Sequence, residues 1–76
     1  MSKFSNYLRK LIDQSGESIT SISRHTGIER TSIHKALKDE RILSYKTMQI
    51  LARYLGLCSE ERQEFFRLHD INLQGE

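Results

Sequence analysis

Two short helical runs on either side of one glycine constrain this chain more than any other feature. The stretch Ser18–Lys38 (SITSISRHTGIERTSIHKALK) places apolar residues at helical spacing before and after Gly27. Ser18 suits the N-cap of the first run, and a glycine just beyond its end supplies the left-handed backbone that a sharp turn needs. The pattern predicts a helix, a tight turn and a second helix at a steep angle, which together form a helix-turn-helix unit.

The second run, Arg30–Lys38, has two contrasting faces. At about 100° per residue, an outward arc of about 140° carries hydrogen-bond donors, three of them cationic, and no acid. These outward residues are Arg30, Thr31, His34, Lys35 and Lys38. The opposite side is small or apolar, with Ser32, Ile33, Ala36 and Leu37. A helix with such a floor and such a face is typical of one that lies in the major groove of DNA.

Length and composition indicate one small domain. The 76 residues form a single composition regime, near the lower size at which one hydrophobic core suffices. The one cysteine, Cys58, excludes an internal disulfide, and no apolar run is long enough for a membrane span or a signal peptide. We therefore expect a reducing, cytoplasmic location. The net charge of +2 is too small to argue for nucleic-acid binding, so the distribution of charge has to decide.

Amphipathic spacing predicts an all-α fold of five helices. Their expected ranges are Phe4–Gln14, Ile19–His25, Arg30–Lys38, Tyr45–Leu55 and Glu60–His69. Ser44 is the expected N-cap of the fourth helix and Ser59 that of the fifth. Beyond His69 the pattern has no strong signal, so the chain there either frays or extends the fifth helix.

The chain resembles the lambda-repressor-like and Cro-like (xenobiotic-response-element) family of DNA-binding domains over about Phe4–Leu57. The family pattern is met at Ile22, Ser23, Gly27, Ile28 and Ile33. The run Thr47–Leu57 is similar to the family's fourth helix with its Leu-Gly-apolar ending. The resemblance implies one compact five-helix domain over residues 1–76, with its core at about 4–57 and the last helix as a dimer or domain contact.

Three positions depart from the family pattern. Ile19 stands where members often carry a glutamine that holds a phosphate. Leu37 replaces a frequent acid, and Asp39 replaces a common glycine. These departures bear on individual DNA contacts more than on the fold.

The resemblance implies a sequence-specific regulator of bacterial or phage transcription that binds double-stranded DNA, most often a repressor occupying an operator. The family's base-reading positions correspond to Arg30, Thr31 and Lys35, and His34 is close enough to join them. Glu29 is repulsive toward phosphate and suited to accept from a cytosine amino group. The expected phosphate contacts are Ser18, Thr20, Ser21, Lys38, Arg41, Tyr45 and Lys46.

A lone helix-turn-helix reads only a few base pairs, so we expect a homodimer on a roughly palindromic site. The fifth helix carries more apolar residues than one contact with the fourth helix would use. The candidate dimer contact is Phe65, Phe66, Leu68 and Ile71.

Other functional classes have less support in the sequence. The three histidines and Cys58 lack the paired spacing of a metal site, and neither a phosphate-binding glycine loop nor a nucleophile elbow occurs. We therefore expect no enzyme, no cofactor and no metal. Two alternatives stay open: an antitoxin-like protein-interaction module that uses Phe65 and Phe66, and a DNA-targeting domain of a longer protein whose C-terminal effector is not in these residues.

Overall fold

Five helices contain most of residues 2–74, the part of the chain that the structure describes. In this computed structural model they are α1 (Lys3–Ser15), α2 (Ile19–Thr26), α3 (Arg30–Leu37), α4 (Tyr45–Tyr54) and α5 (Ser59–Leu73). No strand occurs between residues 2 and 74, so the expected all-α, five-helix architecture is confirmed. The first four helices match their predicted bounds to within one residue. The fifth continues past His69 to Leu73.

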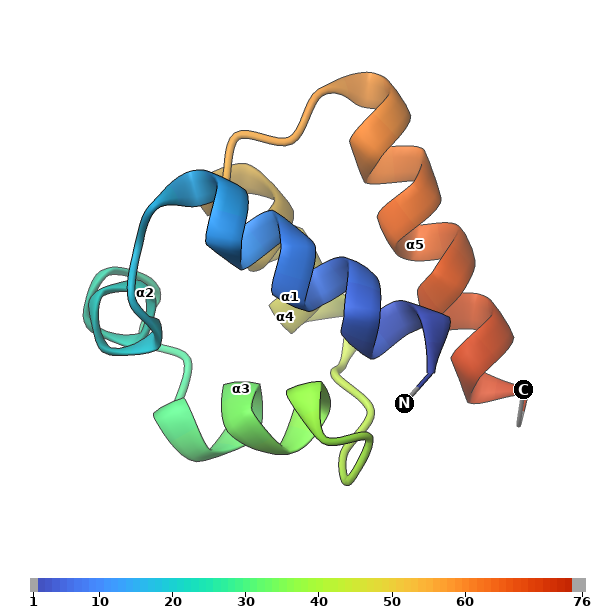
Figure 1. Ribbon diagram of the computed structural model, residues 1–76, viewed down its shortest axis with the longest axis horizontal. Coiled ribbons are helices and arrows are strands. Elements are labelled where there is room, and N and C mark those ends of the chain that lie inside the picture. The colour runs from blue at the N-terminus through green and yellow to red at the C-terminus, as the bar shows by residue number, and fades with distance from the viewer. Residues whose placement is uncertain (1, 75–76) are drawn as a thin grey trace.

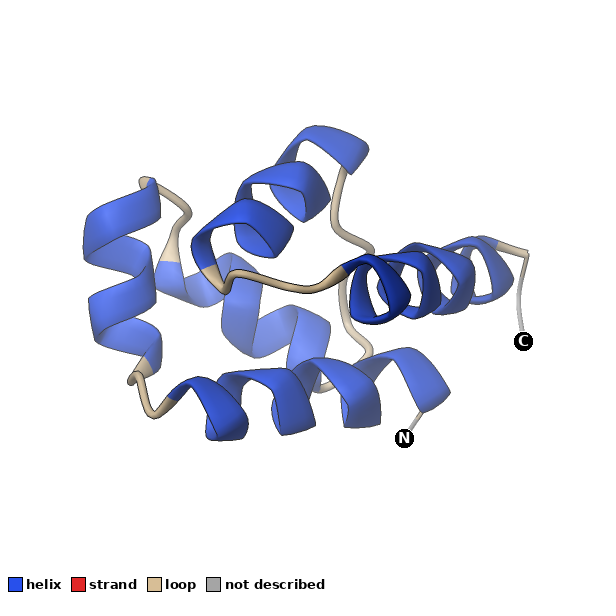
Figure 2. Cartoon of the chain, turned by 90° about the horizontal axis from the view of Figure 1, so that it is seen from above, coloured by secondary structure: helices blue, strands red, loops and turns tan. Residues whose placement is uncertain are grey.

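The helices form a compact domain in which α3 occupies one side. Figure 1 shows α1 crossing the molecule, with α3 below it, α4 behind it and α5 at the right. Figure 2, seen from above, separates α2 at one end from α5 at the other. Contacts join α1 to both α3 and α5, and α2 to both α3 and α4. The position of α3 is therefore set by its contacts with α1 and with α2.

Serine caps begin three of the helices, as local chemistry favours. Ser2, Ser18 and Ser44 each accept a hydrogen bond from the backbone N–H three residues ahead, over 3.1, 3.0 and 3.2 Å. The cap of α5 differs from the expectation. Cys58, not Ser59, is the N-cap, because the Glu61 carboxylate reaches back to the Cys58 N–H over 3.1 Å.

One apolar core runs through all five helices. Its largest fully buried apolar side chains are Phe4, Leu8, Ile22, Ile33, Met48, Leu51 and Phe65. The Phe4 and Phe65 rings stack with centroids 5.5 Å apart, which joins α1 to α5.

Two members of the predicted dimer contact belong to this core, so that part of the prediction is wrong. Phe65 is 0% exposed and Leu68 is 4% exposed. The physical reason is that α5 packs mainly against α1 instead of leaving an apolar face to solvent. Phe66 and Ile71 are half-buried.

The turn after α3 is tied to the start of α1 by one carboxylate. Asp39 has a left-handed backbone with φ of 60°. Its side chain accepts from the Ser2 backbone N–H over 2.7 Å, the Ser2 hydroxyl over 2.6 Å and the Ser5 hydroxyl over 3.2 Å. Desolvation raises the pKa of Asp39, but these hydrogen bonds outweigh it, so the pKa lies below its ordinary value. We call these three residues the Asp39 clamp.

Replacing Gly27 should test the turn between α2 and α3. Gly27 has φ of +79°, and a Cβ built there would meet nothing within 4 Å. The cost of Gly27→Val is therefore backbone strain alone, about 1–3 kcal/mol in the free energy of unfolding measured by urea titration. Gly27→Asn should cost less, because asparagine tolerates the left-handed region. Equal losses for the two variants would contradict this account.

The Asp39 clamp should show in the pH dependence of stability. Asp39→Asn keeps a residue that tolerates positive φ but removes the charge, and should cost about 0.5–1.5 kcal/mol at pH 7. Since the folded pKa is lowered, the contribution is complete above the unfolded pKa of about 3.9 and is lost as pH falls through the folded pKa. The gap between wild type and variant in thermal melts should thus close in acid. Glu40→Gln, in the same turn, is the control and should show little gap at any pH.

Candidate nucleic-acid interface

The exposed face of α3 brings together all the residues predicted to read bases. On the opposite side of the helix, Ile33 is 0% exposed and Ala36 is 1% exposed, and both belong to the core. The outward side chains are all exposed, namely Arg30, Thr31, His34, Lys35 and Lys38. Within residues 2–74 none of these five side chains makes a hydrogen bond or an ion pair. The face is therefore a set of donors that the fold itself does not use.

The turn that leads into α3 is held by hydroxyl groups. The Ser23 hydroxyl donates to the Ile28 carbonyl over 2.5 Å, which ties α2 to the loop. The Thr26 hydroxyl donates to the Ile22 carbonyl over 2.6 Å and accepts from the Ile28 N–H over 3.2 Å. Ile28 is itself buried. These hydrogen bonds hold the loop between α2 and α3 at both of its ends.

Arg41 lies against the flank of α3. Its guanidinium donates to the Ser32 hydroxyl over 2.7 Å. At about 100° per residue, Ser32 borders Lys35 on the helix surface. Arg41, predicted as a phosphate contact, therefore adds a cation beside the exposed face of α3.

The start of α2 carries hydroxyls, but not all of them point outward. Ser18 serves as the N-cap, and Thr20 is exposed with no side-chain hydrogen bond among the described residues. Ser21 donates to the Glu17 carboxylate over 3.0 Å, and Tyr54 donates to the same oxygen. The Tyr54 hydrogen bond, with that of Ser21, holds the pKa of Glu17 below its ordinary value. Of the three predicted phosphate contacts here, Ser21 is therefore the least available.

Tyr45 and Lys46, the first two residues of α4, have different surroundings. Tyr45 stacks on Phe66 with ring centroids 6.2 Å apart, and its hydroxyl donates to Asp70. That hydrogen bond raises the pKa of the Tyr45 hydroxyl. The Tyr45 side chain thus faces α5 and not α3, while Lys46 is exposed without a side-chain partner among residues 2–74. Only Lys46 keeps the features of a phosphate contact at this helix end.

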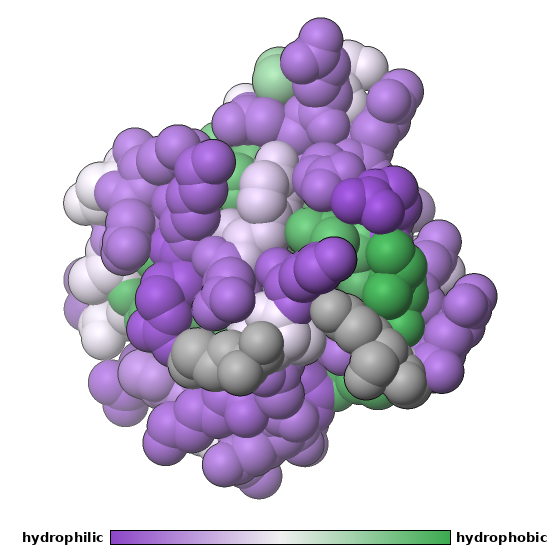
Figure 3. Space-filling view, turned by 45° about the vertical axis from the view of Figure 1, so that its right-hand side comes forward, coloured by the Kyte–Doolittle hydropathy of each residue, from purple (hydrophilic) through white to green (hydrophobic). Residues whose placement is uncertain are grey.

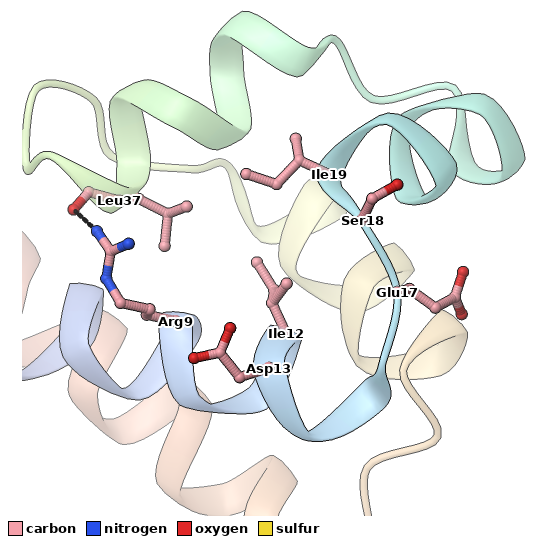
Figure 4. A pocket seen from close by; sticks show the side chains of 7 residues that line it. All are labelled: Arg9, Ile12, Asp13, Glu17, Ser18, Ile19 and Leu37. Atoms are coloured by element: carbon pink, nitrogen blue, oxygen red, sulfur yellow. Dashed lines mark hydrogen bonds between the residues drawn. The ribbon is translucent and has the colours of Figure 1, made fainter.

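A cavity of about 230 Å³ lies where α1, the start of α2 and the end of α3 meet. Figure 4 shows Ile12, Ile19 and Leu37 turned toward it, and Arg9 reaching from α1 to the Leu37 carbonyl. That hydrogen bond spans 3.5 Å and gives the last turn of α3 a cationic donor. Aliphatic and charged side chains line the cavity together. Its lining residues belong to the contact between α1 and α3 that supports α3.

Metal-binding clusters and membrane-spanning helices are absent from the described residues. No group of three or more His, Cys, Asp or Glu side chains between residues 2 and 74 is placed to hold a metal ion. None of the five described helices is long and apolar enough to cross a membrane. Cys58, the N-cap residue of α5, is a free and exposed cysteine.

Large apolar side chains that are exposed are few in the described part of the chain. They are Ile42, Tyr45 and Leu73, each about half exposed. Figure 3 turns the α5 side of the molecule forward and shows hydrophobic patches separated by hydrophilic side chains. This face is therefore mixed, in contrast to the uniformly polar outer face of α3.

The exposed face of α3, with Arg41 at its flank, is the feature of this structure that most resembles a binding surface. Comparisons with protein-family models, with curated proteins and with solved structures find no match to this chain. The function is therefore inferred from the residues and geometry of the exposed face of α3 and of the side chains around it.

Proposed function

We propose that this chain is a sequence-specific domain that binds double-stranded DNA, of the lambda-repressor-like and Cro-like helix-turn-helix kind. In this proposal it belongs to a cytoplasmic transcription regulator that represses by occupying an operator, without catalysis. The observation that carries the proposal is the outer face of α3, whose five donor side chains are exposed and unpaired within residues 2–74.

The shape of α3 suits the major groove. An α-helix with its side chains is about 10–12 Å across, which fits the width of about 12 Å of that groove. The first two residues of α3 are exposed. Arg30 and Thr31 stand in its first turn, where helices of this kind place their base contacts. Lys35 and His34 follow one turn later. The exposed cations Lys38, Arg41 and Lys46 surround this set and suit phosphates.

Of the two rival hypotheses, one is less well supported. An antitoxin-like protein-interaction module was to use Phe65 and Phe66, but Phe65 is buried in the core and is not available to a partner. A DNA-targeting domain of a longer protein makes the same use of α3 and differs only in what is attached. The DNA-binding role of α3 is therefore common to the two better supported hypotheses.

Substitutions should separate base reading from phosphate contact. Arg30→Ala should cost about 1–3 kcal/mol on the preferred duplex and much less on scrambled duplexes, because a base contact is lost. Lys46→Ala should weaken binding to both kinds of duplex alike and reduce the salt slope by about one unit. The measurement is fluorescence anisotropy with both duplexes across a salt series.

Arg62→Ala is the matched control for these variants. Arg62 is an exposed cation on α5, away from α3, and should leave both affinities nearly unchanged. If Arg30→Ala lowered the affinity for preferred and scrambled duplexes equally, α3 would act as a nonspecific cationic surface. The claim of sequence-specific recognition would then be wrong.

We also propose that two copies bind a palindromic site with half-site centres about 34–36 Å apart. With Phe65 and Leu68 buried, the contact between copies is left to Phe66, Ile71 and the exposed Tyr45 and Leu73. Sedimentation should give two protomers on the full palindromic duplex and one, bound more weakly, on a half-site. A single protomer bound equally well to both duplexes would contradict the dimer.

A further inference from the structure

We infer that α3 is directed at guanine, so that the preferred half-site of this domain contains two G·C pairs. This inference rests on the proposed function and deepens it by naming the class of DNA sequence. It follows from the side chains that have no hydrogen-bond partner among the described residues at the N-cap and in the first two turns of α3. These are Glu29, Arg30, Thr31, His34 and Lys35, all exposed and without side-chain hydrogen bonds within residues 2–74.

The chemistry of these side chains matches one base pair better than the other. In the major groove guanine presents two acceptors, N7 and O6, while adenine presents an acceptor and a donor. The Arg30 guanidinium and the Lys35 ammonium can only donate, so they fit guanine. Reading adenine with two hydrogen bonds needs a side chain that both donates and accepts, such as asparagine or glutamine. The run from Glu29 to Lys38 contains neither residue.

The Glu29 carboxylate, an acceptor at the start of α3, also favours a G·C pair. Glu29 is the N-cap of α3 but makes no side-chain capping hydrogen bond, and its carboxylate is exposed. A carboxylate is repelled by phosphate and can accept from the cytosine N4 amino group. Glu29 next to Arg30 thus offers the acceptor and the donor that the two bases of one G·C pair require.

The remaining two side chains leave this preference intact. Thr31 can touch a thymine methyl group or an adjacent acceptor, and His34 can hydrogen-bond either purine. Neither one excludes a G·C pair.

The number of donor-only side chains sets the number of pairs. Arg30 and Lys35 lie about 140° apart around α3 and about 7.5 Å apart along its axis, so they can address two different base pairs. Arg41 does not add a third reader, because its guanidinium is held by the Ser32 hydroxyl at the flank of the helix. The structure thus provides two donor-only readers at the two edges of the exposed face of α3.

A selection from duplexes with a random core, with the purified full chain at about 0.1 M salt, tests this directly. The expected result is an enriched site with G·C pairs at two positions. An enriched site that is read through A·T pairs only would overturn this inference while leaving sequence-specific DNA binding in place. No retention of any duplex would overturn the proposed function, and this inference with it.

Base analogues and one substitution then assign the reader. Replacing the enriched guanines one at a time by 7-deazaguanine removes the N7 acceptor, and one replacement should weaken wild-type binding on the order of tenfold. The same replacement should have little further effect on Arg30→Ala, but its full effect on the control Arg62→Ala. Equal sensitivity of both variants to every replacement would overturn the role of Arg30.

Arg30→Gln gives the complementary readout, because glutamine both donates and accepts. At the base pair that Arg30 contacts, the preference should shift from guanine toward adenine by about tenfold. Thermal melts of both Arg30 variants should match wild type, since Arg30 is exposed and has no partner within residues 2–74. A folded Arg30→Gln protein that keeps the guanine preference would overturn the inference.

Discussion

The burial of three isoleucines around one tight turn is the constraint on which the rest of this structure depends. Ile22 on α2 and Ile33 on α3 are 0% exposed, and Ile28 between them is buried as well. A fully buried isoleucine stabilises the fold by about 1.5–3 kcal/mol, so this trio outweighs the strain of the turn. Gly27 at φ of +79° makes the geometry accessible. Because close-packed contacts resist small shifts, they hold α3 at one angle and leave its outer face free.

Among the described residues, several acidic side chains are used in hydrogen bonds within the fold, whereas the cations on α3 are not. Three carboxylates accept hydrogen bonds from hydroxyls: Glu17 from Tyr54, Asp39 from Ser2 and Ser5, and Asp70 from Tyr45. None of them forms an ion pair with a cation of α3 among the described residues. These three acids are thus engaged within the fold, whereas the cations on α3 have no hydrogen-bond or ion-pair partner among the described residues. A nearly neutral chain can in this way present a local positive face, which net charge alone would not reveal.

Local features of the sequence were predicted well, and contacts distant along the chain were not. Caps and apolar spacing act within four or five residues, so the bounds of the first four helices and the free face of α3 could be read from the sequence. The Asp39 clamp joins residues 34 and 37 positions apart, and no local pattern signals it. The same holds for Tyr45, which turns toward Asp70, 25 residues away. Phe65 was misjudged because periodicity shows that a residue is apolar without showing which helix covers it.

The fifth helix is best understood as part of the core that supports α3, and His69 shows why. Its imidazole is 1% exposed, and its Nε2 donates to the Leu43 carbonyl over 2.5 Å. Its Nδ1 has no hydrogen-bond partner within residues 2–74, which is a cost of burial. Edge-on packing against Phe4 and Tyr45 offsets that cost, with ring centroids 5.7 and 5.0 Å away. One side chain therefore connects α5 to α1 and to the segment before α4, and α1 in turn packs against α3. In a domain this small, such a shared contact adds core that four helices would lack, and it stiffens the support behind the exposed face of α3.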